Sequence, residues 1–258
     1  MKVQTMLLST LLAGVALAGV VDPRASTAKA KGSSKPAAVD KGKGHTATSA
    51  CHKAMFQAIT GKTVKRETDG ETDDEPVPFV LSKRAKPPVE MGLAADATAA
   101  DGLTTTGLAT CFGLGLTIPS TPAPLTNKVL AHVNPNGFVG LSAFETKATA
   151  AVHAAKQANP HLNVVPSLYL STANMEREAT LMAQDTAMTA VLQQSWPGRF
   201  DTQASREAFH LQGMQKNQAD LFTGINRMAA ALGAQVHPKA RTGSSGTMTI
   251  AANNAVSY

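Results

Sequence analysis

The chain has 258 residues, of which 43% are hydrophobic, 16% charged and 4% aromatic. So few aromatic residues disfavour a surface that stacks nucleic-acid bases, and a total of two cysteines excludes a disulfide-scaffold mini-protein and a four-cysteine zinc site. The net charge of +6 is concentrated in residues 1–84, which hold 13 Lys+Arg against 8 Asp+Glu, whereas residues 85–258 hold 11 against 10. The sequence therefore predicts no nucleic-acid partner.

Residues 1–21 have the features of a signal peptide. Lys2 supplies a positive charge, and an apolar run extends from Met6 to Val21. This run is shorter than the roughly 20 residues that a membrane-spanning helix needs, and the Ala-Leu-Ala sequence at 16–18 is typical of a cleavage site. No later segment is apolar for long enough to span a membrane. We expect a secreted protein without a membrane span.

Residues 22–84 are predicted to form a disordered pro-segment that is removed after export. The segment offers few apolar groups to offset the entropy cost of ordering it, although residues 51–60 have the pattern of a short amphipathic helix. The pairs Lys65-Arg66 and Lys83-Arg84 resemble kexin-type processing sites. The alternative explanation is that the two basic pairs occur by chance. The second pair, however, lies directly before the point where the amino-acid composition of the chain changes.

Residues 85–258 predict a single domain of class α+β, since short strands precede and follow a helical middle. The domain is long enough to build its own core, and we expect it to fold without the leader. Helices are expected at 142–158, 175–194 and 205–232. Strands are expected at 89–95, within 103–118, and at 128–133, 163–170, 235–236, 247–250 and 255–258.

Cys111 is the one thiol that remains if the leader is cut off at Arg84, because Cys51 leaves with it. An unpaired cysteine in a secreted domain is either a buried small hydrophobe or a reactive nucleophile. The neighbouring residues from Gly107 to Gly115 are small and apolar, which suits burial. Small residues also let a substrate approach the backbone and let N–H groups form an oxyanion hole.

A catalytic thiol needs a base, and His132 is the strongest candidate. It lies in an apolar strand-like run, whereas the other histidines of the domain fall in predicted helices, loops or the C-terminal region: His153, His161, His210 and His237. From position alone, a hydrogen-bonded core histidine is the alternative interpretation of His132. In the leader, His45, Cys51 and His52 form a weak metal-ligand pattern.

The order of these residues resembles that in the chemoreceptor glutamine deamidase family CheD. The segment Thr105-Thr-Gly-Leu-Ala-Thr-Cys111, followed by a strand with His132, is similar to that family's Thr-x-Gly-x-Gly-Ser-Cys and the histidine on its next strand. The same order occurs in deamidating toxins of the cytotoxic necrotizing factor type. The chain departs from the pattern at Ala109 and Thr110, and its Cys-to-His gap is longer.

Two further segments are similar to CheD. Ser171-Thr-Ala-Asn-Met175 resembles the family's Gly-Gly-Ala-Asn-Met, and residues 233–250 resemble its closing hairpin. The resemblance covers residues 88–175 and 218–258, with a helical insertion between them. It implies a layered α/β/β sandwich in which long helices pack on a mixed sheet.

The resemblance implies a protein glutamine deamidase that needs no metal or organic cofactor. Cys111 is then the nucleophile, His132 the general base and acid, and Thr105 the residue that orients the imidazole. The partner is a protein with an exposed glutamine, which is converted to glutamate, and transglutamination is a side reaction. Because an exported protein does not meet a cytoplasmic receptor of its own cell, a toxin-like or effector-like deamidase delivered to another cell fits the leader better.

Two other functions remain open at this stage. A cysteine peptidase uses the same pair of residues and releases peptides rather than ammonia. A non-catalytic secreted binding protein would instead join Cys51 and Cys111 in a structural disulfide. In the deamidase, the same disulfide would block the nucleophile Cys111 until the bond is reduced. The alternative for the deamidase is that Cys51 is a spare, unpaired thiol.

Overall fold

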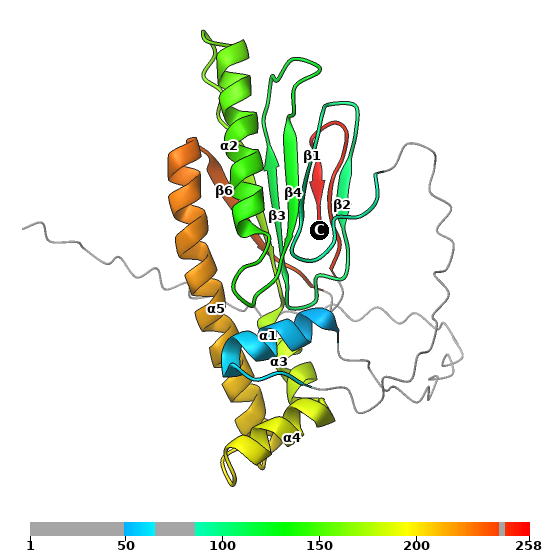
Figure 1. Cartoon of the computed structure of the whole chain (residues 1–258), viewed down its shortest axis with the longest axis vertical. Helices are drawn as coiled ribbons and strands as arrows, with labels where there is room; N and C mark the ends of the chain where they lie inside the picture. Colours follow the sequence, from blue (N-terminus) through cyan, green and yellow to red (C-terminus); the bar gives the residue numbers. More distant parts are fainter. Residues whose placement is uncertain (1–48, 65–85, 243–245) are drawn as a thin grey trace, which may run out of the picture. The chain divides into compact units, whose positions relative to one another are not determined.

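The computed structural model describes residues 49–64, 86–242 and 246–258, and two sheets organise them (Figure 1). A five-stranded sheet has the order β1-β4-β3-β5-β6, and a three-stranded sheet has the order β2-β7-β8. Neighbouring strands are antiparallel except β5 and β6, which are parallel. The strands are β1 (Ala94–Ala97), β2 (Leu103–Thr105), β3 (Phe112–Thr117), β4 (Lys128–Val133), β5 (Ser167–Thr172), β6 (Gln235–Ala240), β7 (Met248–Ile250) and β8 (Val256–Ser257).

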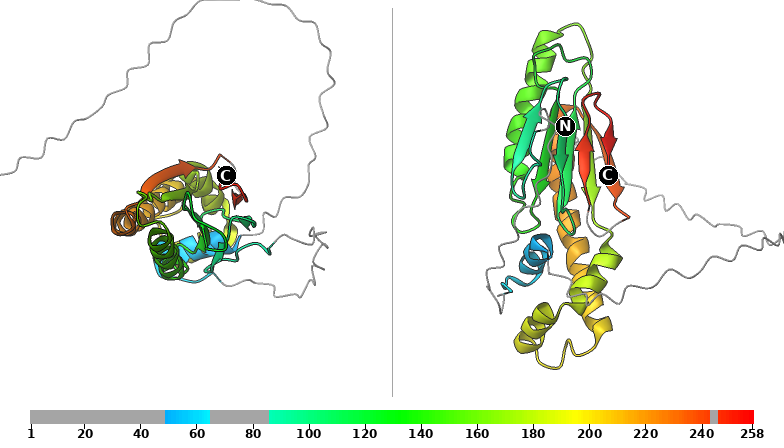
Figure 2. Two further views of the ribbon diagram at one scale, coloured as in Figure 1. Left: turned by 90° about the horizontal axis from the view of Figure 1, so that it is seen from above. Right: turned by 90° about the vertical axis from the view of Figure 1, so that its right-hand side faces the viewer.

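The described residues also form five helices, which confirms the α+β class. They are α1 (Ala50–Thr60), α2 (Leu141–Ala158), α3 (Met175–Gln184), α4 (Thr186–Ser195) and α5 (Gln203–Leu232). Figure 2 shows α2 on one side of the five-stranded sheet and β7 and β8, in red, on the other. This arrangement gives three layers: helices, a mixed sheet and a small second sheet. None of the described helices combines the length and the apolar character that crossing a membrane requires.

Successive side chains along β3 and β4 point to opposite faces of the five-stranded sheet, so they pack into two different hydrophobic cores. Val129, Ala131 and Val133 of β4 pack into the core beneath the helices, whereas Leu130 packs into the core between the two sheets. On β3, a Cβ atom at Gly113 or Gly115 would lie 2.9 Å or less from Met248. The glycines of this strand are therefore explained by the close approach of β7, and the same alternation directs His132 towards the second sheet.

The expected helix at 175–194 is wrong as a single element, because it divides into α3 and α4. Asp185 separates them with an extended backbone, and its carboxylate accepts a hydrogen bond of 2.8 Å from the backbone N–H of Met188. An aspartate in this position satisfies a free N–H group at the start of a helix, so a new helix begins there. The Ala/Met/Leu composition that continues through this point conceals the break.

The expectation that residues 22–84 are disordered is wrong for Ala50–Thr60, which form α1, whereas removal of the segment stays a prediction. All of the described residues belong to one compact unit, and α1 lies within it. Met55 and Phe56 of α1 are buried in the main core, and Gly213 of α5 allows the side chain of Ile59 to approach closely. The folded domain therefore does not begin at Ala85. The predicted signal peptide and both dibasic pairs lie outside the described residues.

We predict that Phe56→Ala lowers the free energy of unfolding by about 3–5 kcal/mol. Phe56 is fully buried, so its removal leaves a cavity between α1 and the body of the protein. Leu162→Ala is the matched control, because Leu162 is 55% exposed and its truncation is expected to cost less than about 0.5 kcal/mol. Urea unfolding measures both changes. Equal stability of the two variants would show that α1 does not belong to the cooperative unit.

Stability is expected to fall as the pH drops from about 6.5 to about 4, partly because of His210. Burial lowers the pKa of His210 to about 4, with a smaller contribution from the charge of Arg206, and neither ring nitrogen has a hydrogen-bond partner among the described residues. The unfolded chain binds this proton near pH 6.5 and the native protein only near pH 4, so acid favours unfolding by on the order of 3 kcal/mol.

The variant His210→Leu tests this pH dependence. The slope of the unfolding free energy against pH should decrease between pH 4 and 6.5, whereas His161→Leu, at an exposed loop position, should leave it unchanged. An unaltered slope in His210→Leu would contradict the assignment.

Candidate functional site

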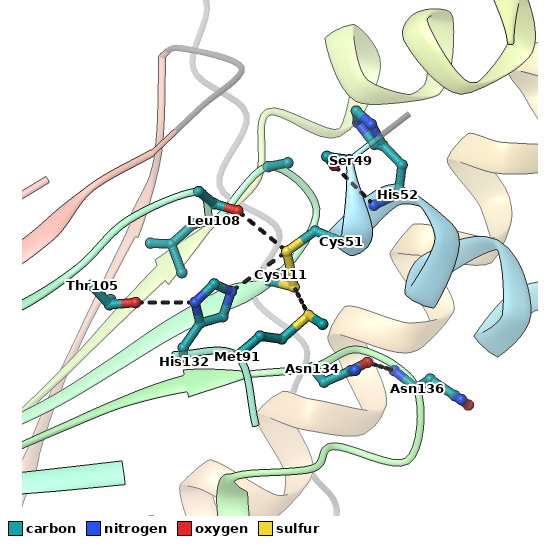
Figure 3. Close-up of a disulfide and its surroundings, with 12 residues drawn as sticks. Ser49, Cys51, His52, Met91, Thr105, Leu108, Cys111, His132, Asn134 and Asn136 are labelled. Atoms are coloured by element: carbon teal, nitrogen blue, oxygen red, sulfur yellow. Dashed lines mark hydrogen bonds between the residues drawn. A yellow bond between two sulfur atoms is a disulfide. The ribbon is translucent and has the colours of Figure 1, made fainter. Parts of the chain in front are cut away.

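A disulfide joins the two cysteines of the chain at the N-terminal end of α1 (Figure 3). Cys51 lies in the first turn of α1, where Ser49 caps the helix by accepting a hydrogen bond from the N–H of His52. Cys111 directly precedes β3, and its side chain is fully buried. The structure therefore shows the bond between Cys51 and Cys111 rather than a spare thiol.

His132 lies beside this disulfide and is hydrogen-bonded to Thr105 from the second sheet. The Thr105 hydroxyl donates to the carbonyl of Val89 at 2.7 Å and lies 3.0 Å from His132 Nδ1. Since its single proton is used on Val89, the hydroxyl oxygen accepts from Nδ1–H. The imidazole is thereby fixed in the tautomer that carries its proton on Nδ1, and Nε2 has a free lone pair.

The lone pair of His132 faces the sulfur atoms. Nε2 lies 3.4 Å from Cys51 Sγ, and the two sulfurs and a ring nitrogen of His132 all lie within 4.8 Å of one another. Burial lowers the pKa of His132 to about 4, with a further contribution from the charge of Arg241. The ring is therefore neutral at pH 7. All three residues proposed from the sequence, Cys111, His132 and Thr105, meet at one place.

Arg241 is a part of this site that the sequence did not indicate. Its guanidinium is buried and donates to the carbonyls of Leu108, Ala109 and Cys111 and to the Ser171 hydroxyl. These bonds fix the loop before β3 and place a positive charge beside Cys111. Burial lowers the pKa of Arg241 to about 10, so it remains protonated at pH 7. Arg241 directly follows β6, whereas the expected strand ended at 236, so no signal in the sequence marked this arginine.

Met91 is the second residue that sequence analysis missed. Its Sδ atom lies 3.6 Å from Cys111 Sγ, and a backbone bridge pairs Met91 with His132. Met91 is 37% exposed, in contrast to the buried cysteines and His132. It therefore forms the side of the site that is nearest to solvent, and no motif spacing marks it in the sequence.

His52 connects α1 to α3. Its Nε2 contacts the carboxylate of Glu178, which is fully buried, and the other carboxylate oxygen has no hydrogen-bond partner among the described residues. Cys51 is in the disulfide, and His45 lies outside the described residues. The leader pattern of His45, Cys51 and His52 is therefore not supported as a ligand set.

The remaining histidines lie away from this site. His153, His161 and His237 are exposed, and His210 packs between the rings of Phe56 and Phe209. These positions agree with the structural roles expected for His153, His161 and His210.

Comparison with known proteins does not assign the chain to a family. No protein-family model matches it, and no curated protein is significantly similar to it. The resemblance to CheD thus rests on the motif alone.

We predict that Thr105→Val lowers the free energy of unfolding by about 1–3 kcal/mol, because it leaves the Val89 carbonyl and His132 Nδ1–H unpaired in the core. Thr105→Ser is the matched control, since it keeps the hydroxyl. The ¹⁵N chemical shifts of His132 report the tautomer directly. A predominant Nδ1–H form in both the native protein and Thr105→Val would show that the hydroxyl does not fix the imidazole.

Proposed function

We propose that the protein is a secreted, cysteine-dependent protein glutamine deamidase that becomes active when its Cys51–Cys111 disulfide is reduced. The observation that supports this most strongly is the direction of His132. Its protonated nitrogen is bound by Thr105, and its free lone pair lies 3.4 Å from the Sγ atom of Cys51, the disulfide partner of Cys111. A buried acceptor nitrogen needs a donor, and the neighbouring sulfur supplies one only when the disulfide is reduced to thiols.

The proposed reaction uses these residues as follows. Cys111 Sγ attacks the carboxamide carbon of a substrate glutamine, and the thiol proton passes to His132 Nε2. The C–N bond then breaks, and ammonia leaves with that proton. Water attacks the resulting thioester while Nε2 accepts its proton, and cleavage of the C–S bond returns the proton to Cys111 and releases glutamate.

Two neighbouring side chains favour this chemistry. The guanidinium of Arg241, which is bonded to the Cys111 carbonyl, stabilises a thiolate at the same residue. Thr105 plays the part that a carboxylate or amide plays in other triads by holding the second imidazole nitrogen. Neither a metal nor an organic cofactor is required for these steps. The same thioester reacts with an amine in a transglutamination side reaction.

The disulfide makes the exported form latent in this proposal. The pairing occupies the nucleophile, and Cys111 is fully buried. An oxidising compartment forms the bond, and the reducing interior of a target cell breaks it. After cleavage at Lys83-Arg84, α1 would still be held by the burial of Met55 and Phe56 and by the His52–Glu178 contact. The disulfide is therefore not the only interaction that holds α1 to the rest of the domain.

A non-catalytic secreted binding protein is the second candidate, and one observation favours it. The disulfide lies between two buried residues in the core between the sheets, as a purely structural bridge does. In that case His132 is a satisfied core histidine, and reduction only destabilises the protein.

The product of the reaction separates these functions. The Cys51→Ser variant is incubated with a panel of glutamine-containing proteins, and ammonia release and peptide masses are measured. A deamidase releases ammonia and increases the mass at a glutamine by about one dalton, as expected for amide-to-acid conversion. New peptide termini would indicate a peptidase. Absence of both, with the fold intact by circular dichroism, would favour the binding protein. The double variant Cys51→Ser/Cys111→Ser is the matched control.

A further inference from the structure

We propose that the reduced protein binds one Cu(I) ion through Cys51 Sγ, Cys111 Sγ and His132 Nε2, with Met91 Sδ as a fourth, weaker ligand. The inference goes beyond the proposed function and does not depend on it. It starts from the grouping of three metal-binding side chains, which is the one such group found within the described residues.

The donor atoms are already close together. The sulfurs and the ring nitrogen lie within 4.8 Å of one another, and Met91 Sδ lies 3.6 Å from Cys111 Sγ. Breaking the disulfide lets the sulfurs separate to the distance of roughly 3.7 Å that two thiolates on one metal need, given metal–sulfur bonds of about 2.3 Å. Small rotations of the two cysteine side chains accomplish this without unfolding the elements that carry them.

The chemistry of the donor set selects the metal. Two thiolates and a thioether are soft ligands, and soft ligands favour Cu(I) over hard cations such as Mg²⁺ and Ca²⁺. Zinc also binds thiolate and imidazole, but its usual protein ligands do not include thioether sulfur. The position of Met91 beside Cys111 therefore favours copper over zinc.

The surroundings of the donors fit a metal-bound state. Thr105 already holds Nδ1–H of His132, which is the outer hydrogen bond that orients most metal-bound histidines. Two thiolates with Cu(I) carry one net negative charge, and the guanidinium of Arg241 lies beside Cys111 to balance it. The 37% exposed Met91 provides the entry path, because the other three donors are buried.

Formation of the site requires two balanced steps. A water-soluble trialkylphosphine and one water molecule reduce the disulfide, which yields two thiols and the phosphine oxide. Cu(I) then replaces the two thiol protons, which pass to the buffer. Copper remains Cu(I) throughout.

The experiment titrates the reduced, desalted protein with Cu(I) from its coloured bicinchoninate complex under nitrogen. The reduced chain is expected to take one copper, and the disulfide form of the same chain none. Cys51→Ser and Cys111→Ser should lose this uptake. X-ray absorption should show one sulfur fewer around copper in Met91→Leu, whereas Met175→Leu, a partly buried methionine on α3, should match the native protein.

Several results would overturn the proposal. They are uptake that persists in Cys51→Ser, zinc displacing bound copper in competition, an unchanged sulfur shell in Met91→Leu, or a reduced chain whose circular dichroism shows lost helix. Thr105→Val should weaken copper binding by about tenfold to a hundredfold. No substrate enters these measurements, so their failure is distinguishable from failure of the deamidase proposal.

Discussion

Replacing Cys111 by serine is expected to lower glutamine hydrolysis by on the order of a thousandfold or more, and replacing Cys51 by serine to give a protein that is active without a reductant. Both changes break the same disulfide. They differ in which sulfur remains beside His132. An unactivated serine hydroxyl is a far weaker nucleophile than a thiolate, so a nucleophile at Cys111 is lost in Cys111→Ser, and activity that remains there would point to Cys51, whose Sγ lies 3.4 Å from His132 Nε2.

The pair of variants controls for loss of the bridge, because both lack it. Mass spectrometry of substrate glutamines and an ammonia assay, each with and without a thiol reductant, measure the difference. The first turn of α1 begins at the exposed Ala50, and without the bond its fraying opens the way to Cys111. Equal activity of the two variants would rule out Cys111 as the nucleophile.

Reduction of the disulfide is expected to lower the free energy of unfolding of the intact chain by about 4 kcal/mol, the value for a closed loop of this length. The cysteines are 60 positions apart. Breaking their bond frees the unfolded chain from a large loop constraint, and this effect exceeds that of most single substitutions. Urea unfolding of the oxidised and reduced protein measures it.

The double variant Cys51→Ser/Cys111→Ser provides the control, since its stability should not respond to the reductant. A change of less than about 1 kcal/mol on reduction of the native protein would contradict the account, because such a small effect would mean that the bond does not constrain the unfolded chain. It would also weaken the case for a purely structural bridge.

The strand that carries His132 could be predicted from the sequence because its signal is local. Four of the six residues from Lys128 to Val133 are apolar and two of them are β-branched, and the observed bounds of the strand agree with the prediction. The long helices α2 and α5 were predicted to within two residues for the same reason. The pairing of Thr105 with His132 was expected from the CheD motif, and the structure places them in hydrogen-bond contact.

The role of α1 could not be predicted from composition. The surrounding residues are polar and small, so an average over 22–84 hides the four residues of α1 that are buried. The contacts that anchor α1 involve residues distant in sequence: Glu178 contacts His52, and Gly213 lies against Ile59. A pattern read along the chain does not contain such pairings.

Arg241 and Met91 could not be predicted for a related reason. Each contacts Cys111 only because strands far apart in the sequence come together, and neither belongs to a recognisable spacing. The break at Asp185 was missed because a capping aspartate inside a helical composition looks like an ordinary surface residue.

The pH dependence of Cys111 alkylation in the Cys51→Ser variant tests the central claim most directly, because it requires no knowledge of the substrate. The rate of reaction with iodoacetamide reports the fraction of thiolate. We predict that Cys111 reacts faster at pH 7 in Cys51→Ser than in Cys51→Ser/His132→Gln while both keep the fold, because Nε2 of His132, held by Thr105, accepts the thiol proton. Equal alkylation rates of the two variants across the pH range would contradict the proposal that Cys111 and His132 form a catalytic pair.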